Sequence, residues 1–181
     1  MNSIVKQPKW KTVEYSRSQI IKAGKTIKKD NATADEIKLA TKVIDNWRAS
    51  HAFPMHVIYM HLRRMAKSNN SIIVAERLKR LDSIVGKLKR EPTMSLWAIQ
   101  DLGGCRVIVP SVDDVYNYAN SYENSRKRHE LVSTYDYIEQ PKFSGYRSLH
   151  RVYKYHSDSV DIYNKNMLIE IQFRTHLQHL W

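Results

Sequence analysis

The fold is decided by the stretch Leu102-Gly-Gly-Cys-Arg-Val-Ile-Val-Pro-Ser-Val-Asp-Asp114. Its apolar part, 102–109, is short and ends at Pro110, which is typical of a buried strand. Ser111 and the two aspartates that follow predict the start of a helix, because a serine can cap free backbone amides and acids stabilise the first turn. A buried strand that leads at once into a helix places this stretch at the centre of a sheet.

The segments around this centre add further strands and helices. Strands are expected at about 129–135, 148–155 and 167–174, with a short extended segment at Ile72–Ala75 and a helix from Ser83 to Arg90. Helices come first in the chain and strands follow with one crossover helix. The sequence therefore predicts an α+β fold with a mixed sheet of about five strands, flanked by helices.

Residues 1–68 form a basic N-terminal region that is expected to be helical. Thr33 is a plausible N-cap, apolar residues then recur every three or four positions, and Pro54 is expected to end that helical region before a second helix. Residues 69–181 are expected to form a second region, and both regions are expected to make one compact unit. We also expect this second region to continue beyond Trp181.

Charge is distributed unevenly along the chain. Residues 1–90 contain 20 Lys and Arg against 7 Asp and Glu, whereas residues 91–181 contain 10 against 11. A solvated, lysine-rich surface would explain a smaller excess, but an excess of this size favours an anionic partner such as a polyphosphate or a nucleic acid.

No apolar run reaches the length of a membrane span, and the N-terminus lacks the apolar core of a signal peptide. The single cysteine, Cys105, cannot form an internal disulfide and is expected in the core. These features predict a cytoplasmic protein without a membrane partner.

Two acids are candidate metal ligands. Asp101 immediately precedes the central strand, and Glu170 lies in the alternating strand Glu170-Ile-Gln-Phe-Arg-Thr175. A carboxylate on an apolar strand needs a partner, which could be Arg174 on the same face or a cation. Two carboxylates among many basic residues suit Mg²⁺, which takes few protein ligands together with substrate phosphates.

The candidate phosphate-binding cations lie upstream. Ser83, Lys87 and Arg90 share one helix face, which could also be simply solvated. Arg106 is the strongest candidate, because an arginine within a buried strand needs an anionic or aromatic partner.

The loop Lys142-Phe-Ser-Gly-Tyr-Arg-Ser-Leu-His150 is the candidate base-binding segment. Gly145 allows a tight turn from which Tyr146 could project and stack on a nucleobase, although a core tyrosine is the alternative. Phe143 and Leu149 are expected in the core.

These segments together resemble the RelA/SpoT-type pyrophosphokinase domain over about residues 72–181. The motifs that carry the resemblance are Arg77-x₅-Ser83-x₃-Lys87-x₂-Arg90, Asp101-Leu-Gly-Gly-Cys-Arg106, Asp136-Tyr-Ile-x-x-Pro-Lys142, Gly145-Tyr-Arg-Ser-Leu-His150 and the Glu170 strand. Residues 33–67 resemble the helical part of small, single-domain members, including toxic CapRel- and FaRel-like proteins. The resemblance implies a nucleotidyltransferase-like sheet.

The resemblance also implies a role for each matched residue. Arg77 and Arg106 would sandwich the adenine of ATP, the pyrophosphate donor. Phosphates would be held by Ser83, Lys87 and Arg90, and Mg²⁺ by Asp101 and Glu170, with Glu170 also acting as general base. Tyr146 would stack on the acceptor base in a pocket that is lined by Lys142, His150 and Gln172.

Two acceptors are compatible with this resemblance, and the charge of the first half favours the 3′-terminal adenosine of tRNA. Lys28, Lys29, Arg63 and Arg64 are the candidate tRNA-binding residues. Such an enzyme would be a toxin that inhibits translation, with an antitoxin as a possible partner. The alternative is an alarmone synthetase that uses GDP or GTP, and a less favoured one is an inactive nucleotide- or RNA-binding module.

Overall fold

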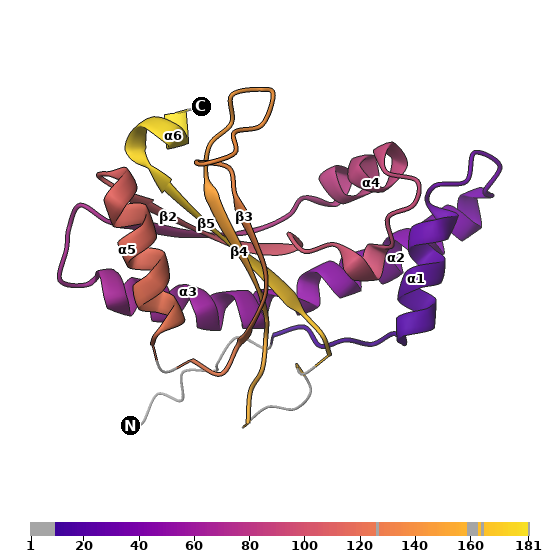
Figure 1. The fold of residues 1–181 in the computed structure, drawn as a ribbon. Helices are drawn as coiled ribbons and strands as arrows, with labels where there is room; N and C mark the ends of the chain where they lie inside the picture. The colour runs from indigo at the N-terminus through magenta and orange to yellow at the C-terminus, as the bar shows by residue number, and fades with distance from the viewer. Residues whose placement is uncertain (1–9, 126, 159–162, 164, 181) are drawn as a thin grey trace, which may run out of the picture.

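The computed structural model describes residues 10–125, 127–158, 163 and 165–180 (Figure 1). The elements follow one another in the order α1 (Arg17–Thr26), α2 (Ala34–Ser50), α3 (Ala52–Ala66), β1 (Ile73–Leu78), α4 (Leu81–Arg90), the 3₁₀ turn η1 (Leu96–Ala98), β2 (Gly103–Val109), α5 (Val112–Glu123), β3 (Glu130–Asp136), β4 (Leu149–Lys154), β5 (Leu168–Thr175) and α6 (His176–Leu180).

The five strands form one mixed sheet in the order β1-β2-β5-β4-β3. Only the central pair, β2 and β5, is parallel, and the other neighbours are antiparallel. The α+β prediction is confirmed. The first strand is longer than expected, because β1 pairs with β2 as far as Leu78 opposite Gly103, so Arg77 lies within the strand.

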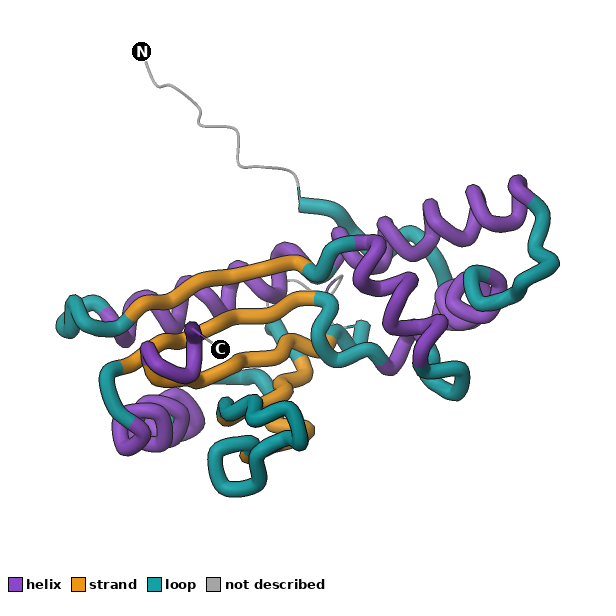
Figure 2. Tube along the Cα trace, turned by 90° about the horizontal axis from the view of Figure 1, so that it is seen from above, coloured by secondary structure: helices purple, strands orange, loops and turns teal. Residues whose placement is uncertain are grey.

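One face of the sheet is buried under α3 and α5; in Figure 1, α3 runs below the strands and α5 stands at their left. Alternate residues of the central strands point to this face because side chains in a strand alternate. They form an apolar core with both helices, including Val107, Ile171, Phe173 and Tyr122. The other face is open and polar, and it is seen from above in Figure 2.

A second core lies beside the sheet, between α1, α2, α4 and η1. The ring of Trp47 in α2 stacks on Trp97 in η1, with centroids 4.7 Å apart. Residues before and after position 68 therefore share this core. Among the described residues, no helix combines the length and apolar character that crossing a bilayer requires.

The prediction that Pro54 ends the first helical region was wrong. Helix α2 ends at Ser50, and α3 begins at Ala52, so Pro54 lies in the first turn of a new helix. A proline is tolerated there because the first amides of a helix have no intrahelical partner. The capping predictions for Thr33 and Ser111 are confirmed, since both side chains accept a hydrogen bond from the third residue of their helix.

Candidate active site

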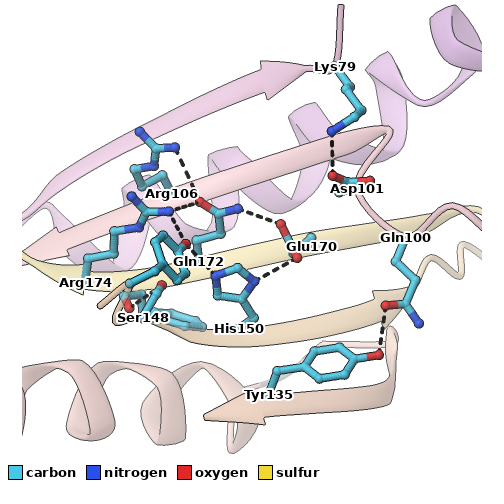
Figure 3. A network of polar contacts seen from close by, with 12 residues as sticks. Lys79, Gln100, Asp101, Arg106, Tyr135, Ser148, His150, Glu170, Gln172 and Arg174 are labelled. Carbon is cyan, nitrogen blue, oxygen red and sulfur yellow. Dashed lines mark hydrogen bonds and ion pairs between the residues drawn. The ribbon is translucent and has the colours of Figure 1, made fainter. Parts of the chain in front are cut away.

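The open face of the sheet brings polar residues from three strands side by side. Strand pairing places Glu170 between Gly104 and Val152, and Gln172 between Arg106 and His150. Residues that are paired across strands point to the same face. The row Arg106, Gln172 and His150 therefore crosses β2, β5 and β4 beside Glu170 (Figure 3).

Glu170 is held by neighbours rather than by the cation on its own strand. Its Oε1 is 2.8 Å from Nδ1 of His150, and its Oε2 accepts a hydrogen bond of 2.6 Å from Nε2 of Gln172. Arg174 does not form the ion pair with Glu170 that the sequence suggested, but donates to the hydroxyl of Tyr146 and to Oε1 of Gln172.

The pKa of Glu170 follows from these contacts. Burial raises it, but the hydrogen bond and the charge of His150 and the hydrogen bond from Gln172 outweigh burial, so the pKa lies below the ordinary value. Glu170 is therefore ionised at neutral pH and can accept a proton or bind a cation.

Asp101 lies at the end of the loop before β2, between two lysines. Nζ of Lys79 is 2.7 Å from Oδ2, and Nζ of Lys87 is 3.2 Å from Oδ1. Burial raises the pKa of Asp101, but the hydrogen bond from Lys79 and the charges of both lysines lower it further than burial raises it. The N-terminal region contributes to this arrangement, because Arg48 of α2 donates to the backbone carbonyl of Lys79.

A first cleft of about 360 Å³ lies over β1 and β2. Arg77 and Arg106 border it from adjacent strands, staggered by two residues, which corresponds to about 7–8 Å. The hydrogen-bond partners of Arg106 within the described residues are neutral, Gln172 at 3.4 Å and His179 at 3.5 Å, and its Nε is buried without a partner there. This cation is therefore available to an anion or a flat ring.

A second cleft of about 600 Å³ lies over β3, β4 and the loop between them, which rises above the sheet in Figure 1. It is lined by rings, cations and amides, namely Lys87, Gln100, Tyr135, Tyr137, Lys142, Ser144, Tyr146 and His150. Lys142 lies over the ring of Tyr137 at 4.3 Å and near that of Tyr146 at 5.3 Å. At the outer side, the hydroxyl of Tyr135 donates to Gln100 (Figure 3).

The two clefts meet at three residues, Asp101, Glu170 and Gln172, which line both. Each cleft is in the size range of small-molecule sites. Two molecules that occupy the clefts would therefore face each other across the two carboxylates.

Not every predicted residue lies at this junction. Of the predicted phosphate-binding residues on α4, Lys87 lines the second cleft, whereas Ser83 and Arg90 lie outside the lining of both. All four predicted acceptor residues, Lys142, Tyr146, His150 and Gln172, line the second cleft.

The prediction for Phe143 was wrong. Its side chain is fully exposed on the loop, whereas Leu149 is 2 % exposed and belongs to the core, as expected. Gly145 adopts a φ of 81°, which favours glycine and supports the predicted turn. Tyr146 is half-buried beside His150, whose Nε2 is 2.8 Å from its hydroxyl.

The four predicted tRNA-binding cations are not brought together. Lys28 and Lys29 follow α1, and Arg63 and Arg64 end α3; these helix ends lie at opposite ends of the molecule (Figures 1 and 2). The ammonium of Lys28 donates to the backbone carbonyls of Pro92 and Met94. Lys29, Arg63 and Arg64 are exposed.

Sequence reasoning assigned no role to several residues that the structure places at the site. Lys79 is one of them. It could have been predicted from the sequence, because it lies two residues after Arg77 and therefore on the same face of an extended chain. Arg174 was named only as a possible ion-pair partner of Glu170, and its contacts with Tyr146 and Gln172 were not expected. Gln100 and Tyr135 had no such signal, because only the fold brings them together.

The donor set fits Mg²⁺. Asp101 and Glu170 are ionised carboxylates at the junction of both clefts, and this ion commonly binds one or two carboxylates together with substrate phosphates. Within the described ranges, no group of three or more His, Cys, Asp or Glu residues could hold a metal by itself. The remaining ligands would therefore come from a substrate or water.

Comparison with known proteins identifies the family. Residues 76–181 match the model described as "Region found in RelA / SpoT proteins". The chain is 36 % identical over 110 residues to GTP pyrophosphokinase YjbM and over 115 residues to GTP pyrophosphokinase YwaC, both of Bacillus subtilis strain 168. These matches cover 60 % and 58 % of this chain, but 51 % of each relative, so the chain spans about half the length of the curated relatives it matches.

Solved structures support the same fold. Small alarmone synthetase 1 of Bacillus subtilis, bound to its product pppGpp, superposes with a TM-score of 0.65 at 27 % identity and covers 77 % of both chains. A GTP pyrophosphokinase family protein of Streptococcus pneumoniae has a TM-score of 0.62 at 32 % identity, over 70 % of this chain and 66 % of that chain. Similarity to the toxic CapRel- and FaRel-like members stays a prediction. The mixed sheet, the two carboxylates at the junction of its clefts and the match over residues 76–181 together show that this chain belongs to the RelA/SpoT family.

Proposed function

We propose that this protein transfers the β,γ-pyrophosphate of ATP to the 3′-hydroxyl of a guanosine nucleotide, GDP or GTP. The observation that carries the proposal is the meeting of two clefts at Asp101 and Glu170. A reaction that joins two nucleotides needs one cleft for each and a charged centre between them.

The first cleft suits ATP. Arg77 and Arg106 offer two flat guanidinium groups on adjacent strands, and a purine ring could stack between them. Lys79 lines this cleft and Lys87 the other, both beside Asp101, where the phosphates would pass toward the junction. Arg90 and Ser83 could reach the phosphates only if α4 or their side chains move when ATP binds.

The second cleft suits the acceptor. Tyr146 and Tyr137 provide aromatic rings, and Lys142 provides a cation beside both. A nucleobase stacked on a tyrosine would leave its ribose between the rings and Glu170. This places the 3′-hydroxyl on the side of the cleft that Glu170 and Gln172 line.

The chemistry follows from this placement. The 3′-oxygen attacks the β-phosphorus of ATP, the bond from that phosphorus to the oxygen bridging the α-phosphorus breaks, and AMP leaves with this oxygen. Glu170 takes the proton of the hydroxyl. Lys79 and Lys87 stabilise the charge on the phosphates, and Mg²⁺ held by Asp101 and Glu170 would add to this stabilisation.

The acceptor assignment differs from the first choice of the sequence analysis. Relatives named GTP pyrophosphokinase and a structure bound to pppGpp support a guanosine nucleotide over tRNA. The 3′ end of tRNA stays the second candidate, and the observation in its favour is the excess of 20 basic over 7 acidic residues in residues 1–90. An antitoxin partner is relevant only to this second candidate.

A labelling experiment distinguishes the acceptors. The protein is incubated with γ-labelled ATP and Mg²⁺ in the presence of GDP, GTP or deacylated tRNA, and Glu170→Gln serves as the inactive control. We expect label in GDP or GTP and more than a 100-fold loss in Glu170→Gln, within the usual contribution of a general base. Label in tRNA alone would overturn the guanosine assignment, and label in no acceptor would contradict the transferase proposal.

A further inference from the structure

Arg174 is a buried cation that forms no ion pair with a carboxylate among the described residues. Its side chain lies on β5, two residues beyond Gln172 and four beyond Glu170, and the residue is 6 % exposed. A buried charge is costly unless it is hydrogen-bonded. Its guanidinium donates through Nη2 to two neutral groups, the hydroxyl of Tyr146 and Oε1 of Gln172, the latter at 2.7 Å.

Both of these groups connect Arg174 to Glu170 through hydrogen bonds. Gln172 accepts from Arg174 with its amide oxygen and donates with its amide nitrogen to Oε2 of Glu170 at 2.6 Å. Tyr146 contacts Nε2 of His150 at 2.8 Å, and Nδ1 of His150 contacts Oε1 of Glu170 at 2.8 Å. Two chains of hydrogen bonds therefore start at Arg174 and end on different oxygens of one carboxylate. Figure 3 shows the chain through Gln172 and the contact of His150 with Glu170.

The two ends limit the direction of the bonds. A guanidinium can only donate, and an ionised carboxylate can only accept. With a neutral His150, Tyr146 donates its proton to Nε2 of His150, and His150 carries its own proton on Nδ1, facing Glu170. The same logic orients the amide of Gln172, with its oxygen toward Arg174. Both chains start from Nη2 of Arg174, whereas its buried Nε has no hydrogen-bond partner among the described residues.

We propose that Arg174 is a positioning residue, which holds the carboxylate of Glu170 toward the junction of the two clefts through Gln172 and through Tyr146 and His150. This inference rests on the proposed function, because it assigns Glu170 the central role. It also explains why β5 carries a cation on the same face as Glu170 without forming an ion pair with it. A direct ion pair would lower the basicity of the carboxylate that takes the proton more than the neutral amide of Gln172 does.

The arrangement couples the acceptor cleft to the reacting centre. Tyr146 and His150 line the acceptor cleft, and both lie in the chain between Arg174 and Glu170. A base that stacks on Tyr146 would contact a ring whose hydroxyl is held by hydrogen bonds to Arg174 and His150. The acceptor therefore meets a preorganised site, in which the carboxylate and the ring hold fixed relative positions.

Arg174→Lys tests the proposal, because lysine keeps the charge but its shorter and more flexible side chain does not hold a nitrogen at the position of Nη2, which donates to both acceptors. The matched control is Arg151→Lys. Arg151 is a partly buried arginine of β4 that also donates twice, to the backbone carbonyl of Ala119 and to Asn120, but under the opposite face of the sheet. We expect kcat to fall about 10- to 100-fold in Arg174→Lys, as for other outer partners of metal-binding carboxylates, and to stay within about 3-fold in Arg151→Lys.

Two further readouts separate positioning from a general loss of structure. The KM for ATP, whose cleft Arg174 does not line, should change less than 3-fold. In the double variant Arg174→Lys with Tyr146→Phe, the fold-loss of kcat should be smaller than the product of the fold-losses of the two single variants. Both changes break the same chain of hydrogen bonds. If Arg174→Lys does not fold, Tyr146→Phe alone cuts one chain and should reduce kcat severalfold.

A measurement without turnover keeps this inference separate from the proposed function. The ring nitrogens of His150, observed by ¹⁵N NMR, should show the tautomer with a proton on Nδ1 in the wild type and in Arg151→Lys, and a changed spectrum in Arg174→Lys. An active wild type with full kcat in Arg174→Lys, or an unchanged His150 spectrum in that variant, would overturn the positioning role. An inactive wild type with the expected NMR change would contradict the proposed function and leave the hydrogen-bond chain supported.

Discussion

Phe143 and Leu149 show how differently two apolar side chains of one segment are placed. Phe143 lies at full exposure on the loop above the sheet, and Leu149, six residues later, is buried opposite Phe173 of β5. Burial removes apolar surface from water and fills the core, so only Leu149 stabilises the fold. One apolar residue of this segment therefore belongs to the core, whereas the other is exposed to solvent.

This contrast predicts the stability of two alanine variants. Leu149→Ala should lower the free energy of unfolding by about 2–5 kcal/mol, because it leaves a cavity, whereas Phe143→Ala should change it by less than about 0.5 kcal/mol. Urea denaturation followed by circular dichroism measures both. A loss above 1 kcal/mol in Phe143→Ala would show that the loop packs onto the protein in solution.

At the scale of elements, close contacts decide how the helical region meets the sheet. Helix α1 packs against η1 at Gly24, where an added Cβ would come within 2.7 Å of Cβ and 3.3 Å of the backbone nitrogen of Leu96. In α4, a Cβ at Gly86 would meet only the flexible end of Arg90, at 3.3 Å. The helical pattern of both segments was predictable from the sequence, but the close approach at Gly24 was not, because it depends on a residue 72 positions away.

Alanine at these two glycines should therefore have opposite effects. Alanine normally stabilises a helix interior by up to about 1 kcal/mol relative to glycine. In Gly86→Ala we expect part of this gain, whereas Gly24→Ala should destabilise the protein by about 1–3 kcal/mol, because α1 must move away from η1. Thermal unfolding of both variants tests this, and a stabilised Gly24→Ala would contradict the packing described for α1.

For the whole molecule, the buried His51 and the half-buried His129 set the response to acid. His51, at the junction of α2 and α3, is 1 % exposed, and its Nδ1 lies 2.7 Å from the carbonyl oxygen of Trp47. Burial lowers its pKa to about 4, despite the hydrogen bond to Trp47, which raises it. Burial, followed by the charge of His61, also lowers the pKa of His129 to about 4.

The sign of the pH effect follows from these shifts. Between pH 6.5, the ordinary pKa, and about 4, the unfolded chain binds more protons at these histidines than the folded one, so stability falls as the pH decreases through this window. For His51 alone the loss amounts to roughly 3 kcal/mol. Urea unfolding from pH 7 to 4 should show it, and His51→Gln should have a shallower slope by about one proton. An equal slope in the variant would contradict a neutral, buried His51.

The sequence by itself determined the strands, the caps of two helices, the polar face of β5 and the family motifs, because these depend on local spacing and on the alternation of side chains. The two carboxylates were named from such patterns and the acceptor residues from the resemblance to the family, and all of them line the clefts that meet at the two carboxylates.

Only the tertiary structure decided which partner each of these residues takes. Glu170 could have paired with Arg174 on its own strand, but the register of β4 places His150 opposite Gln172, diagonally beside Glu170, and α4 and the end of β1 bring Lys87 and Lys79 to Asp101. The physical reason is the distance along the chain over which each kind of interaction acts. Patterns along a chain specify which face a side chain occupies, whereas contacts between strands and helices far apart in sequence depend on register and packing, which arise only when the chain has folded.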